Sequence, residues 1–596
     1  MQLKLISGRK YISLIKQNIM KKFYTQLPFL VFLAMAVGCK SDPSDNPNSG
    51  DVAEKPEYYY TGGELGTTTA WTAKCFEQPS EAVEIAGLGD NFLHGEGIFE
   101  GLFVSETATG YPMSGKGPIS IRSMCIMCHP GYGHGKRLGN YGNDIVGFNT
   151  TSRETGNGYL LVVYGAGNDG VFGADEVITS GITGPTWKNT NAEDDFFVKE
   201  LTGMPQTQSI EPFKAPINED LIEIRWKKYT DEHDNKFADG TSYDLIYPEV
   251  IIPDQAFAYK NANISDGAFK VKVEATIGIY GTGLLDAITE DDIDAEALAQ
   301  SDKVWGGRRG LDKLQPDGSV RKGRFTYGLT RATLQYGPGS NAVWNITNVS
   351  KEGANREQHS NYMTHFYADA ASKDPEVLKD LSNTYYKFLV GKNDEETSIK
   401  VYNYLRHNST YGEKRYEGEW YDYAEGEIKE RIARELPLED YVDFMIWHRG
   451  LAVPAARNTD TEQFKRGMEL FTKMGCDKCH RPSWTTGADD YVGDADVAGK
   501  LPRYPHQKIW PYTDMLQHNL GMKNNIRTGW CRTTPLWGRY LNINANGESS
   551  RLHDMRARDE VEAIMWHKGQ GKYSSDQFRK LDKADRDAVV KFLQSI

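Results

Sequence analysis

The sequence predicts a mainly α-helical protein with two domains of the same kind, the first enlarged by a β-rich insertion. Three observations lead to this fold class. The pattern Cys-x-x-Cys-His occurs at residues 125–129 and again at residues 476–480. Apolar residues at helical spacing lead into the second copy and also close the chain. Between the two copies, runs of β-branched and aromatic residues are typical of strands.

The repeated pattern is the attachment motif of haem c. Its two thiols bond to the porphyrin, and the histidine binds the iron as the proximal ligand. A structural zinc site made from the two cysteine pairs is the alternative, but it leaves the histidine after each pair without a role. The sequence therefore predicts two covalent haems. Their attachment and proximal residues are Cys125, Cys128, His129, Cys476, Cys479 and His480.

Residues 1–38 have the layout of a lipoprotein export signal. Met20 begins a short basic stretch, an apolar run follows over residues 27–37, and small residues stand before Cys39. The apolar run is too short to cross a bilayer. We expect the true start at Met20 and lipid on Cys39. The mature chain would then be anchored in the cell envelope of a Gram-negative bacterium, on the periplasmic side or on the outer-membrane surface.

Composition and length predict the domain organisation. Residues 39–80 are expected to be a disordered stalk, most clearly over 40–57, where Ser, Asp, Pro, Asn and Gly dominate. The remaining chain is too long for a single core. We expect an N-terminal haem domain over 81–440, with a β-rich insertion at about 150–275, and a C-terminal haem domain over 441–596.

Local patterns predict individual helices and strands. The clearest is the helix before Cys476, in which Phe464, Met468 and Phe471 recur at helical spacing. The expected helices cover residues 93–103, 376–389, 426–436, 461–473 and 574–596. The expected strands cover residues 159–164, 250–252 and 269–275. Residues 400–425 are expected to be irregular surface.

Two cysteines stand outside the motifs and the lipid site. The chain has seven cysteines, of which one is assigned to lipid and four to haem, which leaves Cys75 and Cys531. In an oxidising compartment a leftover pair is more often a disulfide than two free thiols. We therefore predict a Cys75–Cys531 disulfide, with two buried free thiols as the alternative.

Several blocks of sequence resemble the di-haem oxidoreductase, putative peroxidase family, which is related to bacterial di-haem cytochrome c peroxidases. The C-terminal blocks are Trp-Pro-Tyr-Thr-Asp (510–514), His-Asn-Leu-Gly (518–521), Arg-Thr-Thr-Pro-Leu-Trp-Gly (532–538), Leu-His-Asp-Met-Arg-Ala-Arg (552–558) and Glu-Ala-Ile-Met-Trp-His-Lys-Gly (562–569). Further blocks lie at 239–241, 280–288 and 323–328. The resemblance covers roughly residues 85–596.

The resemblance implies cytochrome c-like folds and roles for particular residues. In that family the sixth ligand of the second haem falls at the position of His567, and Met565 or Met555 are the alternatives in this sequence. His553 and Arg556 would orient a haem propionate or a ligand; the alternative for both is a structural turn. Met555 stands where the family usually has Gly, which puts the shape of that turn in doubt.

The reactive residues are less defined. Glu274 replaces a residue that is more often basic in the family; it either supplies protons to peroxide or is a solvated charge at a strand edge. His365 is a second catalytic candidate. The sequence does not identify the sixth ligand of the first haem. Several residues are candidates, and the position could also have no protein ligand. Those residues are His359, Met363, His365 and His448.

Residues 167–176 contain Gly-Asn-Asp-Gly followed by Asp-Glu, which hints at calcium. The alternating acidic ligands of a calcium loop are missing, so this segment reads as a turn.

These observations predict an exported di-haem oxidoreductase. It would take electrons from a small external donor (a cytochrome, a cupredoxin or a quinol-linked protein) and reduce peroxide or a similar oxidant at one haem. The alternative is a non-catalytic electron conduit, or a redox partner protein, with two six-coordinate haems. The net charge of −13 argues against nucleic-acid binding and suits a basic donor, and the lipid is the expected contact with a membrane.

Overall fold

The structure is a computed structural model of the chain. It describes residues 54–103, 118–137, 145–147, 158–165, 198, 200–201, 205–265, 268–314, 319–329, 331–334, 364–407, 438–490, 497–524 and 529–596. The chain separates into two units, Met1–Lys55 and Pro56–Ile596. The expected export signal, Cys39 and the expected turn at 167–176 lie outside the described residues. Within the described residues, no helix has the length and apolar character needed to cross a membrane.

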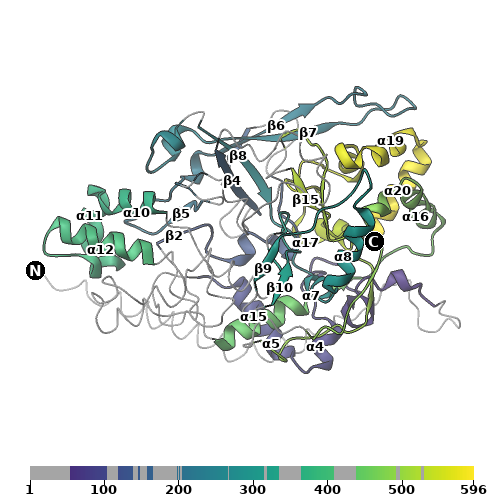
Figure 1. Cartoon of the computed structure of the whole chain (residues 1–596), viewed down its shortest axis with the longest axis horizontal. Coiled ribbons are helices and arrows are strands. Elements are labelled where there is room, and N and C mark those ends of the chain that lie inside the picture. The colour runs from purple at the N-terminus through teal and green to yellow at the C-terminus, as the bar shows by residue number, and fades with distance from the viewer. Residues whose placement is uncertain are drawn as a thin grey trace, which may run out of the picture. The chain divides into compact units, whose positions relative to one another are not determined.

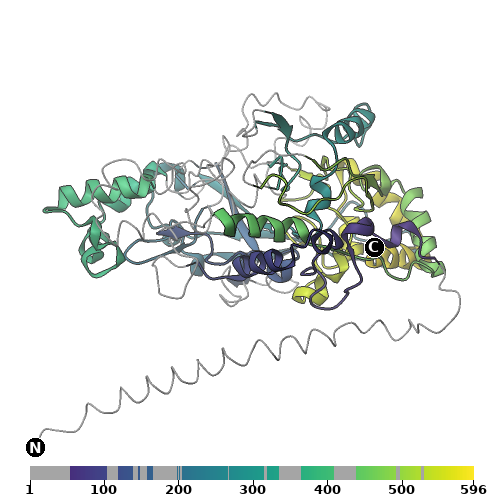
Figure 2. The ribbon, with the colours of Figure 1, turned by 90° about the horizontal axis from the view of Figure 1, so that it is seen from below.

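The described part of the chain is rich in helices, and its strands are short (Figure 1). Two helix pairs lie beside the two Cys-x-x-Cys-His motifs. Helix α5 (Gly89–Glu100) precedes the first motif and packs against α15 (Leu438–Gly450); α16 (Glu462–Lys473) precedes the second motif and packs against α20 (Lys583–Ser595). Figure 2 shows α15, in green, lying along α5, in purple. The two pairs are therefore built alike.

Each pair crosses at a glycine. Gly95 of α5 lies against the backbone of Asp443, and Gly467 of α16 lies against the backbone of Ala588. A Cβ atom on either glycine would collide with the carbonyl oxygen of its neighbour. Glycine is therefore required at both positions by the close approach of the helices, although it is a poor helix former.

The substitution Gly95→Ala should lower the free energy of unfolding by about 1–3 kcal/mol, the usual cost of forcing extra volume into a packed contact. Gly97→Ala in the same helix is the matched control, because a Cβ there meets nothing within 4 Å. Higher helix propensity should make that variant as stable as the parent, or more stable by up to about 1 kcal/mol. Urea unfolding midpoints of the two variants give the comparison, and equal midpoints would contradict the close crossing.

The other helices are shorter. They are α3 (Gly63–Gly66), α4 (Glu81–Ile85), α7 (Thr282–Asp286), α8 (Glu290–Gln300), α10 (His365–Ser372), α11 (Pro375–Asp380), α12 (Asp394–His407), α17 (Asn542–Asn546), α18 (Glu560–Met565) and α19 (Lys572–Lys580). The predicted helix at 376–389 is α11 followed by two 3-10 turns. Residues 400–407, predicted irregular, continue α12, and the predicted helix at 426–436 lies outside the described residues.

The predicted helix at 574–596 is wrong in its continuity. It is two helices, α19 and α20, because Leu581 takes an extended conformation and Asp582 caps α20 by accepting a hydrogen bond from the backbone of Asp585. The predicted helix at 461–473 is confirmed as α16, with Thr461 as its cap. The predicted helix at 93–103 is α5, which begins and ends a few residues earlier.

Two small antiparallel sheets lie between residues 145 and 275, where the sequence predicts β structure. In one, β6 (Glu223–Tyr229) pairs with both β3 (Ile145–Gly147) and β7 (Leu245–Ile251); in the other, β4 (Tyr159–Gly165) pairs with β8 (Phe269–Ala275). The remaining strands form two-stranded pairs. These are β1 (Thr67–Thr68) with β11 (Val453–Pro454), β2 (Ile119–Ser120) with β5 (Gln208–Ser209), β9 (Asp312–Leu314) with β10 (Val320–Lys322), β12 (Trp484–Thr485) with β13 (Lys508–Ile509), and β14 (Gln517–Asn519) with β15 (Trp530–Arg532).

Residues 56–80 are packed rather than part of a disordered stalk. Thr67 pairs with Val453 in a parallel bridge, and the ring of Phe76 stacks on that of Tyr280 with 3.9 Å between the ring centroids. Cys75 and Phe76 are fully buried. The prediction fails here because the polar composition of the segment hides a few apolar side chains that have partners far away in the sequence.

The boundary predicted between residues 440 and 441 falls inside α15. Since this helix packs against α5, it belongs with the first motif as far as Gly450.

The predicted Cys75–Cys531 disulfide is not formed in the structure. Cys75 is a free buried thiol, and it belongs to the large core around α5 and α15, whereas Cys531 lies in β15 against Tyr327. The two cysteines therefore belong to different clusters of buried side chains.

Candidate functional site

The second motif is held at the end of α16. Gly475, with φ of 77°, turns the chain out of the helix, and the backbone amide of His480 donates to the carbonyl of Cys476 at 2.9 Å. The ring Nδ1 of His480 donates to the carbonyl oxygen of Tyr512 at 3.1 Å. This hydrogen bond leaves Nε2 free to bind a metal, which is the usual arrangement of a ligating histidine. Burial lowers the pKa of His480 to about 4, so the ring is neutral near pH 7.

His567 faces His480. It follows α18, and its ring centroid lies 6.3 Å from that of His480. Its Nδ1 donates to the carbonyl of Ala563 at 2.7 Å, which again leaves Nε2 free. Since a metal–imidazole bond is about 2.0–2.1 Å long, two such bonds and the radii of the two rings add up to about 6 Å. The pair therefore fits an iron held between the two rings.

The methionine alternatives lie elsewhere. The sulfur of Met555 accepts a hydrogen bond from Arg539 at 4.0 Å in the core of the β-rich region. Met565 is buried on the inner face of α18. Of the three candidates, His567 is the one whose side chain faces the ring of His480.

The first motif repeats this geometry on its proximal side. The ring Nδ1 of His129 donates to the carbonyl of Ile277 at 3.0 Å, and burial lowers the pKa of His129 to about 4. Phe99 of α5 lies 6.2 Å from the ring of His129, and Phe471 of α16 lies 6.3 Å from the ring of His480. Each phenylalanine stands four residues after the glycine at which its helix pair crosses. The two histidines are thus presented by the same local structure.

The two cysteine pairs do not share a site. Cys125 lies in the core around α5 and α15, whereas Cys476 packs against the clusters around α16 and α20. The zinc alternative, which joins both pairs, has no support in this arrangement. A smaller group of Cys479, Asp514 and His518 does lie close together, with His518 Nε2 2.7 Å from Asp514 and its Nδ1 3.6 Å from the Cys479 sulfur.

The candidates for the sixth ligand of the first haem lie in different places. His448, at the end of α15, is buried; its Nε2 lies 3.5 Å from the hydroxyl of Thr282, and its Nδ1 has no hydrogen-bond partner among the described residues. Burial and the nearby His129 lower the pKa of His448 to about 3. His365 is exposed on α10, and its Nδ1 forms a hydrogen bond with the hydroxyl of Tyr402. His359 and Met363 lie outside the described residues.

Sequence reasoning missed His134. This side chain stands five residues after His129 and is buried, and its Nδ1 also has no hydrogen-bond partner in the described part of the chain. The signal was present, because a second histidine follows the first motif closely in the sequence.

Glu274 is buried, so the interpretation as a solvated strand-edge charge is wrong. Its side chain is 5 % exposed. It lies in β8, which ends at Ala275, so Thr276 and Ile277 follow directly after the strand. The hydroxyl of Thr276 donates to the backbone carbonyl of Cys128, and the next residue, Ile277, accepts the hydrogen bond of His129. Glu274 therefore lies in the strand that leads into the residues in contact with the first motif.

His553 contacts the end of the same strand, β8. Its carbonyl accepts the backbone amide of Ala275 at 2.8 Å, and its ring meets the ring of Tyr327 edge-on at 4.9 Å. Burial lowers the pKa of His553 to about 3, and burial together with the charge of Glu274 raises the pKa of Tyr327 well above its usual value. The His553 Nδ1 and the Tyr327 hydroxyl have no hydrogen-bond partner among the described residues. Such buried polar atoms fit a bound polar group beside the motifs.

Arg556 binds neighbouring protein groups, whereas the family resemblance implies that it orients a haem propionate or a ligand. Its guanidinium donates to both oxygens of Asp554 at 2.7–3.1 Å and to the carbonyls of Lys523 and Asn524, and it lies over the ring of Trp566 at 4.7 Å. These contacts match the structural-turn alternative, in which Arg556 supports the residue that precedes His567.

A cavity of about 800 Å³ opens beside the first motif. Met124 and Met127 line it, together with Lys214 and Glu219, whereas the attachment cysteines and His129 do not. The cavity therefore borders the first motif at Met127.

Comparison with known proteins agrees with the motif blocks. Residues 428–596 match the model of the family described as di-haem oxidoreductase, putative peroxidase. This range contains α15, the second motif, His553 and His567. No curated protein and no solved structure matches the chain.

Proposed function

We propose that this chain, whose residues 428–596 match the model of the di-haem oxidoreductase, putative peroxidase family, is an exported, lipid-anchored two-haem enzyme that reduces peroxide. The observation that carries the proposal is the facing pair His480 and His567, each with Nδ1 bonded to a backbone carbonyl and Nε2 free. Haem c, when bound at both motifs, supplies one-electron redox chemistry and a position for the oxidant.

The chain's own residues divide the work between two cytochrome c-like domains. Cys476, Cys479, His480 and His567 would hold the second haem, which would supply electron transfer from a small donor protein. Cys125, Cys128 and His129 would hold the first haem, which would supply the position for peroxide. The two helix pairs, each crossing at a glycine, support the same fold for both domains.

Reduction of one hydrogen peroxide takes two electrons and two protons and gives two waters. A carboxylic acid within reach of the peroxide can donate the proton that the departing oxygen needs. Glu274 is a buried acid in the strand that leads to Ile277, which accepts the hydrogen bond of His129, so it is the proton donor in this proposal.

The proposal predicts the effect of His567→Ala. The parent protein, fully oxidised, should give the low-spin electron paramagnetic resonance signal of an iron between two imidazoles. The variant should lose this signal from the second haem and show a high-spin signal instead, because the position that the His567 imidazole would occupy is empty. An unchanged low-spin signal would contradict the assignment of His567.

The facing histidines also support a second candidate function, a non-catalytic electron conduit. A haem held by two histidines transfers electrons without binding a substrate. The same spectra separate the two functions. A high-spin signal from the parent protein, either oxidised or after reduction by one electron, supports the peroxidase, whereas low-spin signals throughout, with no peroxide turnover, support the conduit.

A further inference from the structure

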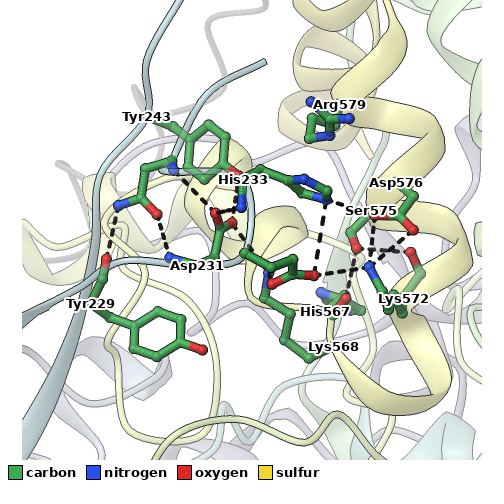
Figure 3. Close-up of polar contacts among 12 residues, drawn as sticks. Tyr229, Asp231, His233, Tyr243, His567, Lys568, Lys572, Ser575, Asp576 and Arg579 are labelled. Carbon is green, nitrogen blue, oxygen red and sulfur yellow. Dashed lines mark hydrogen bonds and ion pairs between the residues drawn. The ribbon is translucent and has the colours of Figure 1, made fainter. Parts of the chain in front are cut away.

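A β-hairpin from the β-rich region reaches the segment that carries His567. Strands β6 and β7 are antiparallel, and the chain between them, residues 230–244, lies against α18 and α19. Figure 3 shows Asp231 and Tyr243 of this hairpin beside Lys568, with His567 next to it. The hairpin is more than 300 residues away in sequence, as its contacts with Lys568 span 337 positions.

Asp231 is the centre of this contact. Its side chain is fully buried. One oxygen accepts the backbone amides of His233 and Asn235 at 2.9 and 3.1 Å, and the other accepts the hydroxyl of Tyr243 at 2.5 Å and the ammonium of Lys568 at 3.2 Å. A buried carboxylate is stable only when it is paired and hydrogen-bonded in this way. The geometry therefore fixes Lys568 in one place.

The residue on the other side of His567 is held by the same hairpin. The ring of Trp566, which is fully buried, stacks on the ring of Tyr229 with 4.8 Å between centroids. The carbonyl of Tyr229 accepts the side-chain amide of Asn235, whose backbone amide is bonded to Asp231. One compact set of contacts thus holds both sequence neighbours of His567.

More contacts fasten the hairpin to the C-terminal helices. Arg586 of α20 donates to Asp239 at 2.8 Å and lies over the ring of Phe237 at 4.0 Å. The amide of Ala238 donates to the carbonyl of Arg579 at 3.0 Å. The hairpin is therefore anchored independently of Lys568, and it can resist movement of the residues that it holds.

We propose that the β6–β7 hairpin positions His567 as an axial ligand, with Asp231 and Tyr229 as the positioning residues. This inference rests on the proposed function, because it takes His567 to be the ligand. The hairpin contact, meaning Tyr229 on Trp566 and Asp231 on Lys568, holds the backbone on both sides of the ligand. Groups behind a metal ligand commonly change its binding by about 10- to 100-fold when they are altered.

Asp231→Asn is the direct test. The change keeps the shape of the side chain but removes the charge that holds Lys568. In the holoprotein, cyanide competes with His567 for the iron, so a weaker hold on His567 raises the apparent affinity for cyanide by the same factor. Cyanide should therefore abolish the two-imidazole low-spin resonance of the variant at about 10- to 100-fold lower concentration than in the parent.

Glu232→Gln is the matched control. Glu232 lies next to Asp231 and also approaches Lys568, at 3.4 Å, but it is 45 % exposed. Both variants lose one negative charge beside Lys568, from neighbouring residues of the hairpin, so a general electrostatic effect would appear in both. The proposal requires Glu232→Gln to lose the low-spin resonance at the same cyanide concentration as the parent.

Lys568→Met gives a second approach to the same link, in case the Asp231 variant fails to fold. It should shift the cyanide titration in the same direction, and the double variant should show the shift of one single variant rather than the product of both. If Asp231→Asn and Lys568→Met titrate like Glu232→Gln while His567→Ala lacks the resonance, the hairpin inference is overturned and the ligand assignment stands. If His567→Ala keeps the resonance, both fail.

Discussion

Replacement of both Cys476 and Cys479 by alanine should yield a protein with one covalent haem instead of two. Each motif supplies two thiols for attachment, and the structure places the two motifs in separate clusters of buried side chains, so neither can substitute for the other. Intact-mass spectrometry should find the mass of one macrocycle, and the haem absorbance per protein should fall by half.

Loss of this haem should also weaken the C-terminal helices. The proximal and distal rings, His480 and His567, would face each other across a space that nothing fills, and a vacated core site costs several kcal/mol, as for a large-to-small substitution at about 3–5 kcal/mol. The thermal unfolding of the variant should therefore begin at lower temperature, with its first transition in the C-terminal part.

The cysteines outside the motifs are the control. Cys75→Ala and Cys531→Ala should each retain both macrocycles, because neither residue belongs to a motif. A protein that keeps two macrocycles after the change at Cys476 and Cys479, or a parent protein with none, would contradict the haem assignment and with it the proposed function.

The residues that could be located from the sequence are those whose chemistry is local. Cys125 to His129 and Cys476 to His480 are contiguous, so the motif alone identifies them. The helix before the second motif was found because Phe464 and Phe471 repeat at helical spacing within a few turns. His567 needed a family resemblance as well, because nothing in its immediate sequence says which ring it faces.

Other features depend on distant partners. In the sequence, Phe76 belongs to a polar segment, and only the fold shows that its ring stacks on Tyr280. Glu274 alternates with apolar residues in β8, which normally marks a solvent-facing side, but Glu274 is buried here. The sequence does not indicate the break between α19 and α20, because the helical spacing of apolar residues continues across Leu581.

The internal duplication was also obscured. The sequence repeats Trp-His at 447–448 and 566–567, yet these pairs are not equivalent. His448 lies in the last turn of α15, which packs like α20, whereas His567 follows α18. The true repeat is a glycine followed four residues later by phenylalanine, at Gly95 and Gly467. It is hard to see because the first copy is separated from its motif by a long segment, and the second by only a few residues.

Glu274→Gln should lower the rate of peroxide reduction by about 10²- to 10⁴-fold, the usual contribution of a positioned proton donor. The glutamine has nearly the same shape and cannot give up a proton, so the loss reflects chemistry more than packing. This factor corresponds to about 3–5 kcal/mol in the activation free energy. Stopped-flow mixing of the half-reduced protein with hydrogen peroxide measures the rate directly.

Two comparisons make this prediction specific. The spin states of both haems should be those of the parent, since Glu274 supports no axial ligand in the proposal. Glu219→Gln removes another buried carboxylate of the N-terminal region, which pairs with Arg122 at 2.7 Å; it should cost stability but leave the peroxide rate within a few-fold of the parent. Equal rates for Glu274→Gln and the parent would exclude Glu274 as the donor, whereas an equal loss in both variants would indicate a general effect of a missing buried charge.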